Sequence, residues 1–216
     1  GTNNTAVGKD ALYSNTTASN NTAVGTDALT TTTTGQQNTA VGFEAGKNTT
    51  TGYNNVFVGE VAGTSNTTGH SNTACGRLAL NLNTTGVYNT ALGSEALQKT
   101  TSNHNVGVGF QSLEENTTGQ ENTSIGSLAL DDNTTGSYNT ALGKGALTAS
   151  TTGSHNHGYG VSSLSSNSTG SRNIGIGYAA LGSSAGLSDS IAIGHQALTS
   201  KTSGNISVSL GNQSLQ

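Results

Sequence analysis

The feature that most constrains the fold is a 17-residue repeat that runs along the chain. A glycine closing the motif N-T-A-V-G marks each unit, and successive marker glycines lie 17 residues apart, except for one step of 16 between Gly93 and Gly109. A unit this short excludes helix-containing repeats, whose periods start near about 20 residues. The thirteen marker glycines are Gly8, Gly25, Gly42, Gly59, Gly76, Gly93, Gly109, Gly126, Gly143, Gly160, Gly177, Gly194 and Gly211.

The unit reads N-T-A-V-G-x-x-A-L-x-x-N-T-T-G-x-x, and its columns predict one coil of a solenoid. Residues before the glycine alternate between β-branched and small types, and this period of two indicates a strand. Asn and Gly of N-T-T-G tolerate positive φ, which favours a turn. We therefore expect an all-β, parallel β-solenoid (β-roll) of about thirteen 17-residue coils, each with two short strands, as a single domain over residues 1–216.

Two apolar columns are predicted to form the core of this solenoid. The first stands directly before the marker glycine, and the second is the leucine of the A-L pair. Cys75 belongs to the first column, which predicts a buried and unreactive thiol. The first core column is Val7, Val24, Val41, Val58, Cys75, Leu92, Val108, Ile125, Leu142, Ile176 and Ile193. The second core column is Leu12, Leu29, Leu80, Leu97, Leu130, Leu147, Leu181 and Leu198.

A column of small residues precedes the first core column and is expected on the opposite face of the strand. One coil buries only about two aliphatic side chains, contributing about 3 to 6 kcal/mol, so packing against other copies is expected to add stability. Small side chains allow close approach of backbones and predict a chain-to-chain interface. Its candidate residues are Ala6, Ala23, Ala40, Ala74, Ala91, Ala141 and Ala192.

Composition argues against several classes of function. Only 8% of residues are charged and the net charge is −4, so no basic patch for nucleic acid is expected. Direct membrane insertion is not expected, because no apolar run reaches about 18 residues. No reactive side chains converge, so we predict no enzyme, no catalytic residue, no cofactor and no metal site. His155 and His157 leave one alternative open, a metal bound by three chains on a threefold axis.

Two of the units carry a resemblance to a known family. Residues 190–194, S-I-A-I-G, and residues 173–177, N-I-G-I-G, resemble the N-S-V-A-I-G signature of YadA-like heads of trimeric autotransporter adhesins. The full repeat also resembles bacterial and phage tail-fibre-like repeats, although the N-T-T-G loop is longer than in the adhesins. The resemblance implies a left-handed, homotrimeric β-roll on a cell surface or virion. It also implies binding to a host or surface ligand, such as a matrix protein or glycan.

The expected function is that of an extracellular adhesive fibre or head, cut or processed from a longer fibre protein. One alternative is a self-assembling extracellular filament or phage tail-fibre shaft. Another is an ice-binding protein, because ranked threonines on a flat β-solenoid face can order water, provided that the threonines do not point inward. Asn66-Thr67-Thr68 and similar sequons allow N-glycosylation, but their regular place in the repeat favours a role in the turn.

Overall fold

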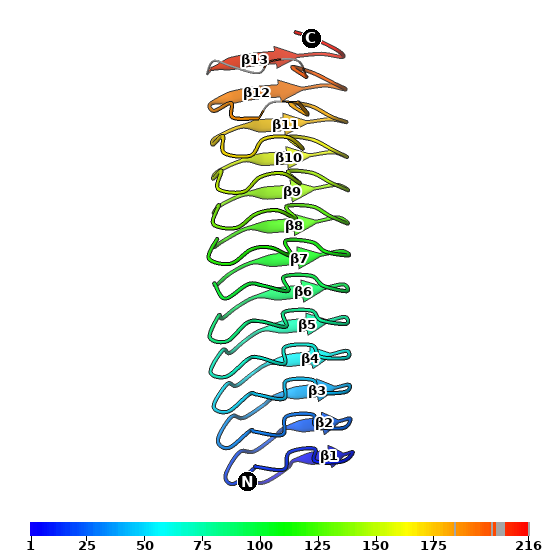
Figure 1. Ribbon diagram of the computed structural model, residues 1–216, viewed down its shortest axis with the longest axis vertical. Helices are drawn as coiled ribbons and strands as arrows, with labels where there is room; N and C mark the ends of the chain where they lie inside the picture. The colour runs from blue at the N-terminus through cyan, green and yellow to red at the C-terminus, as the bar shows by residue number, and fades with distance from the viewer. Residues whose placement is uncertain (184, 200, 202–205, 216) are drawn as a thin grey trace. The chain divides into compact units, whose positions relative to one another are not determined.

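The computed structural model describes residues 1–183, 185–199, 201 and 206–215. Contacts divide the chain into two compact units, Gly1–Asn105 and Val106–Gln216, with the boundary in the coil that is one residue short. The first unit contains β1 (Thr5–Val7), β2 (Thr22–Val24), β3 (Thr39–Val41), β4 (Val56–Val58), β5 (Thr73–Cys75) and β6 (Thr90–Leu92) (Figure 1). The second contains β7 (Val106–Val108), β8 (Thr123–Ile125), β9 (Thr140–Leu142), β10 (His157–Tyr159), β11 (Ile174–Ile176), β12 (Ser190–Ile193) and β13 (Ser207–Leu210).

Both units are all-β, and their described residues form no helix. It follows that no membrane-crossing helix occurs among those residues. Whether residues 1–216 act as a single domain stays a prediction.

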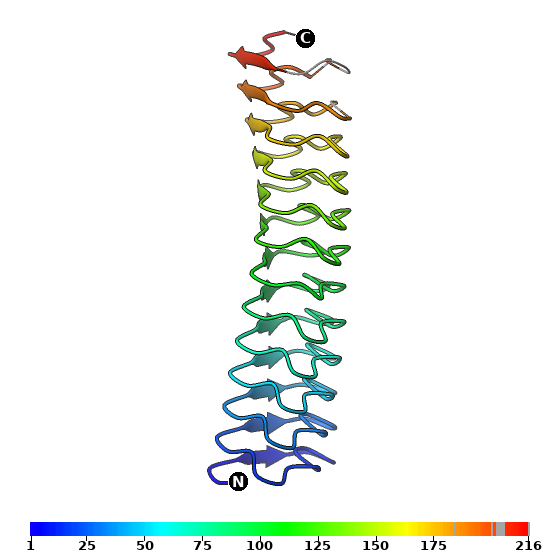
Figure 2. The same ribbon diagram turned by 90° about the vertical axis from the view of Figure 1, so that its left-hand side faces the viewer.

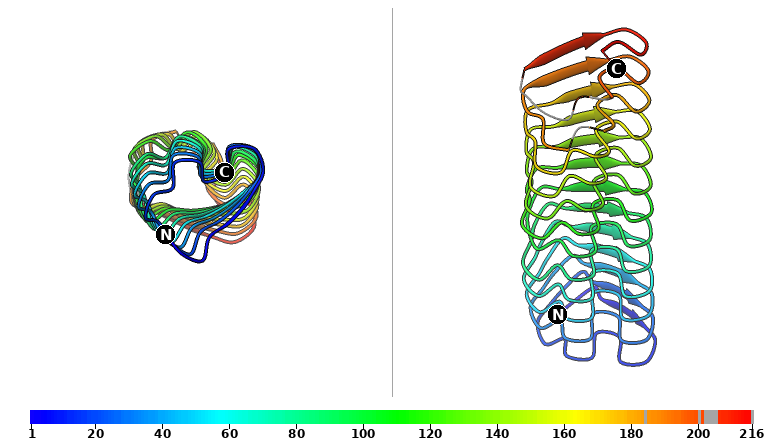
Figure 3. Two further views of the ribbon diagram at one scale, coloured as in Figure 1. Left: turned by 90° about the horizontal axis from the view of Figure 1, so that it is seen from below. Right: turned by 45° about the horizontal axis from the view of Figure 1, so that its top comes forward.

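Within each unit, consecutive strands pair in parallel and in chain order. Residues one repeat apart are partners, as in Thr22 with Thr39 and Thr123 with Thr140. The amide of Thr22 donates to Asn38 O at 2.8 Å, and the amide of Gly25 donates to Val7 O at 2.8 Å, so each coil bonds to the coils on both sides. In each unit the strands stack along one side of the coils and the turns along another (Figures 2 and 3). The predicted parallel β-solenoid is confirmed.

Each described coil contains one strand, whereas two were predicted. The A-L segment opposite the strand stacks on the next coil, with the amide of Leu29 donating to Ala45 O at 3.1 Å. Its leucines nevertheless have positive φ, 49° at Leu29 and 53° at Leu80, which is outside the range of a strand. The prediction of a second strand was wrong because a left-handed residue bends the chain at each leucine.

The leucine column is buried, so the second predicted core column is confirmed. Leu12 is 7% exposed and the other members are between 0% and 2% exposed. The alanine that precedes each leucine is also buried in most coils, for example Ala28 and Ala146. The members of the column are Leu12, Leu29, Leu80, Leu97, Leu130, Leu147, Leu181 and Leu198.

Both the backbone angle at the marker position and the close approach of the next coil require a glycine there. Gly126 has φ of 142°, which residues with a side chain rarely adopt. A Cβ added there would lie 2.5 Å from the carbonyl oxygen of Gly143 in the next coil. The column therefore stacks glycine on glycine at a separation that no other residue type allows.

Buried asparagines form hydrogen-bonded ladders between coils. Asn38 is 1% exposed, and its Nδ2 donates to Gly52 O at 2.9 Å, while its Oδ1 accepts the amide of Asn55 at 3.0 Å. The asparagine of N-T-T-G bonds within its own turn, as Asn66 Nδ2 donates to Gly69 O at 3.1 Å. Asn66 is fully buried, so this part of the sequon serves the turn, as predicted.

Candidate functional site: the outward face of the strands

The first predicted core column points outward from the chain, so that prediction was wrong. In a strand, successive side chains point to opposite faces, and here the middle side chain points into the coil. In β9, Ala141 is fully buried, whereas Leu142 is 46% exposed. Members more than a third exposed are Val7, Val41, Leu92, Ile125, Leu142, Ile176 and Ile193; Val24, Val58 and Val108 are half-buried.

Cys75 belongs to the same column and is exposed, in contrast to the buried thiol predicted. It is the single cysteine of the chain. It pairs in register with Val58 on one side and Leu92 on the other. The thiol therefore lies between two aliphatic side chains of the outward column of the first unit.

The alanine column predicted as an interface lies inside the coils, and that prediction was also wrong. Ala6, in the first coil, is exposed, but the other members are fully buried: Ala23, Ala40, Ala74, Ala91, Ala141 and Ala192. The leucines fill the interior from the opposite side. A Cβ added at Gly175 of this column would already lie 3.1 Å from Leu164 Cγ. The side chains of this column are small because the leucines fill the interior, and a second chain cannot contact them.

A column of threonine and β-branched aliphatic residues lies beside the aliphatic column and also points outward. Thr22, Thr39, Thr73 and Thr90 are half-buried, and Val56 in the same column is 39% exposed. We call the first and third side chains of the strand triplets the strand face. The threonine column consists of Thr5, Thr22, Thr39, Val56, Thr73 and Thr90 in the first unit and of Val106, Thr123, Thr140, His157, Ile174, Ile191 and Val208 in the second.

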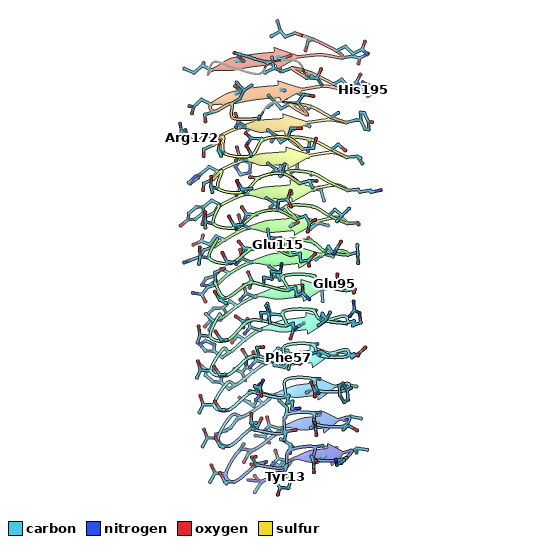
Figure 4. All side chains as sticks on the ribbon, in the orientation of Figure 1. Tyr13, Phe57, Glu95, Glu115, Arg172 and His195 are labelled. Carbon is cyan, nitrogen blue, oxygen red and sulfur yellow. The ribbon has the colours of Figure 1, made fainter. Side chains whose placement is uncertain are left out.

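The strand face contains no Lys, Arg, Asp or Glu; the ion pairs lie at the ends of the strands. Lys47 Nζ lies 2.8 Å from Glu44 and 3.1 Å from Asp27, and hydrogen bonds to these two carboxylates raise the pKa of Lys47. Arg172, labelled in Figure 4, lies on a turn of the second unit. It donates to Asp189 at 2.8 Å, and this lowers the pKa of the Asp189 carboxyl. The charged side chains of these ion pairs thus lie beside the strand face and not on it.

Among the described residues, no three His, Cys, Asp or Glu side chains come together as a metal site within one chain requires. His155 stacks on Tyr138, with ring centroids 4.9 Å apart, while His157 points outward from β10. The side chains of the strand face recur from coil to coil, so we take this face as the candidate functional site.

No family model matches the chain, and neither the curated proteins nor the solved structures yielded a match. Function is consequently inferred from the geometry described above.

Proposed function

We propose that this chain is a non-catalytic, extracellular fibre or head segment that assembles as a left-handed homotrimer through its strand face and attaches to a surface. The observation that carries the proposal is the outward aliphatic column. Val, Ile and Leu side chains such as Ile125 and Leu142, 41% and 46% exposed, recur in this column in a chain rich in polar residues, and Cys75 and Tyr159 take their place in two coils.

Contiguous exposed apolar surface is uncommon on soluble monomers and marks sites of association. Burying it contributes about 25 cal/mol per Å² of apolar area. A second copy of the same chain is the natural occupant, because its columns have the same coil spacing. Each Val, Ile or Leu then meets its equivalents on other copies, with no charged group to desolvate. The resemblance to YadA-like heads supports three copies and the left-handed coil.

Attachment is assigned to the variable side chains at the ends of the strands. Phe43, Phe110 and Tyr178 follow marker glycines and are about half exposed, at 49%, 48% and 51%. They lie outside the strand face and stay accessible in the proposed trimer. Repetition of weak contacts along three chains raises the overall affinity through multivalency. A host surface, matrix protein or glycan is the proposed ligand class.

The proposal is tested by charging the strand face. The double variant Ile125→Lys/Leu142→Lys places two ammonium groups on the aliphatic column of adjacent coils. We expect it to lose the oligomer while keeping the β-sheet circular dichroism of the parent. The control Thr135→Lys/Thr152→Lys adds the same charges to exposed turn positions of the same two coils. If the Ile125/Leu142 variant keeps the parent's mass, the strand face is not the interface.

Ice binding is the second candidate, favoured by the outward direction of the threonine column. Thr22 and Thr39 are adjacent partners on the same face, with Val24 and Val41 beside them. Such regular ranks on a flat sheet can order water. A trimer that buries the strand face excludes this function, so thermal hysteresis by a monomer supports ice binding and contradicts the fibre proposal.

A further inference from the structure

A small open groove lies on the first unit, on the turn segments that precede β3 and β4. Its volume is about 260 Å³, and it is lined by Thr34, Gln36, Gln37, Thr51 and Tyr53. All five residues are exposed. This volume is slightly below the range of about 300 to 1,000 Å³ that accommodates drug-sized ligands, so one small ring is the size that fits.

The Tyr53 side chain is 43% exposed and lines the groove, and His70 covers one face of its ring. His70, one coil further along the chain, stacks on Tyr53 with centroids 4.5 Å apart and planes inclined by 13°. His70 also forms a T-shaped pair with Tyr88, with ring centroids 5.4 Å apart, which extends the ring column. Gln36 and Gln37 of the preceding coil line the groove together with Tyr53.

The polar side chains that line the groove have unused hydrogen-bonding capacity. Neighbouring threonines bond to the next coil, as Thr33 Oγ1 does to Thr50 O at 3.3 Å. Within the part of the chain that is described, the side chains of Thr34, Gln36, Gln37 and Thr51 make no hydrogen bond, nor does the Tyr53 hydroxyl. The two glutamine amides each offer donors and acceptors to a ligand.

We propose that this groove binds a neutral pyranose, either as a free glycoside or as a residue of a surface glycan. The apolar C–H face of the sugar ring packs on the exposed surface of Tyr53, an aromatic ring with an apolar body and a polar tip. The sugar hydroxyls bond to the amides of Gln36 and Gln37 and to the two threonine hydroxyls. No charged residue lines the groove, so a neutral ligand fits and an ionic one does not.

The test uses the full chain and methyl glycosides of glucose, galactose, mannose and N-acetylglucosamine, with binding followed by saturation-transfer NMR. We expect at least one of them to bind and Tyr53→Ala to weaken that binding by about tenfold or more. Tyr138→Ala is the matched control, because Tyr138 also stacks on a histidine but lines no described groove. The affinity of Tyr138→Ala for the same glycoside is expected to stay within about twofold of the affinity of the parent chain.

The inference is overturned if none of the four glycosides binds, or if Tyr53→Ala binds as well as the parent does. Binding of a proline-rich peptide at Tyr53, without sugar binding, overturns the ligand class. The inference deepens the proposed attachment function and rests on it, but the two fail separately. Loss of sugar binding leaves the particle mass unchanged, and loss of the oligomer leaves the groove, which is built within one chain.

Discussion

The ring of Phe57 occupies the space that a leucine side chain at Gly63 would fill. Phe57, labelled in Figure 4, stands in the inward column, where most coils carry alanine, and it is fully buried. Gly63 and Gly46 stand where other coils carry leucine, and a Cβ at Gly46 would lie 2.7 Å from Phe57 Cδ2. One large residue on the strand thus replaces two on the opposite side.

Phe57→Ala is expected to destabilise the chain by about 3 to 5 kcal/mol, because it leaves a cavity that the two glycines cannot fill. The triple variant Phe57→Ala/Gly46→Leu/Gly63→Leu is expected to recover most of this loss. Gly46 and Gly63 have φ of 58°, close to the angles of the leucines elsewhere in the column. Urea unfolding midpoints measure both effects. A triple variant no more stable than Phe57→Ala contradicts the compensation.

The buried asparagine ladder yields a second prediction. Asn38→Ala removes the bond to Gly52 O and leaves the amide of Asn55 without its side-chain acceptor. Each unsatisfied buried group costs about 1 to 3 kcal/mol, so the loss of two partners is expected to cost about 2 to 6 kcal/mol. Asn48→Ala removes a side-chain amide of the same type from an exposed site, and it is expected to change stability by less than about 0.5 kcal/mol. Equal losses in the two variants contradict the role of the ladder.

The glycine column is tested within the second unit. Gly126→Ala forces the backbone apart at Gly143, and we expect it to cost about 2 to 4 kcal/mol. Gly211 also has positive φ, 115°, but an added Cβ there meets no atom within 4 Å. Gly211→Ala therefore isolates the cost of the backbone angle, about 1 to 2 kcal/mol. Thermal unfolding that ranks Gly211→Ala as the more damaging change excludes the stacking argument.

The rate at which the Cys75 thiol reacts with maleimide measures whether the strand face is covered. The thiol is exposed in the single chain, but in the proposed trimer it is buried between copies. We expect maleimide to label the native protein at least about tenfold more slowly than Val58→Asn/Leu92→Asn, in which uncharged polar side chains beside Cys75 disrupt the interface without changing the charge around the thiol. The control Thr68→Asn/Thr85→Asn alters exposed turn residues of neighbouring coils and is expected to stay protected. Rapid labelling of the native protein shows that the face is open.

The sequence was sufficient to predict the coil, its period and the leucine column. Alternation along a strand defines two faces, but it does not say which one points inward. Hydrophobicity alone predicts that the larger side chains of each strand point inward. In the structure the leucines fill the interior and leave room only for small residues such as Ala141. Phe57 opposite Gly63 was the available signal, because a large residue matched by a lost leucine identifies the inward column.

The second strand of the coil could not be excluded from residue types, since leucine is compatible with strands. Its positive φ, 51° at Leu97, is a property of the closed coil rather than of leucine itself. The Tyr53 groove escaped prediction for a related reason. Its side chains come from two coils, and only the stacking register places Gln36 beside Tyr53.

The mass of the native particle in solution, measured by light scattering, tests the central proposal most directly. The chain has a mass of 21.5 kDa. A homotrimer assembled through the strand face predicts three times that mass, independent of protein concentration in the micromolar range. A stable particle with the mass of a single chain contradicts assembly through the strand face and leaves that face free to bind ice.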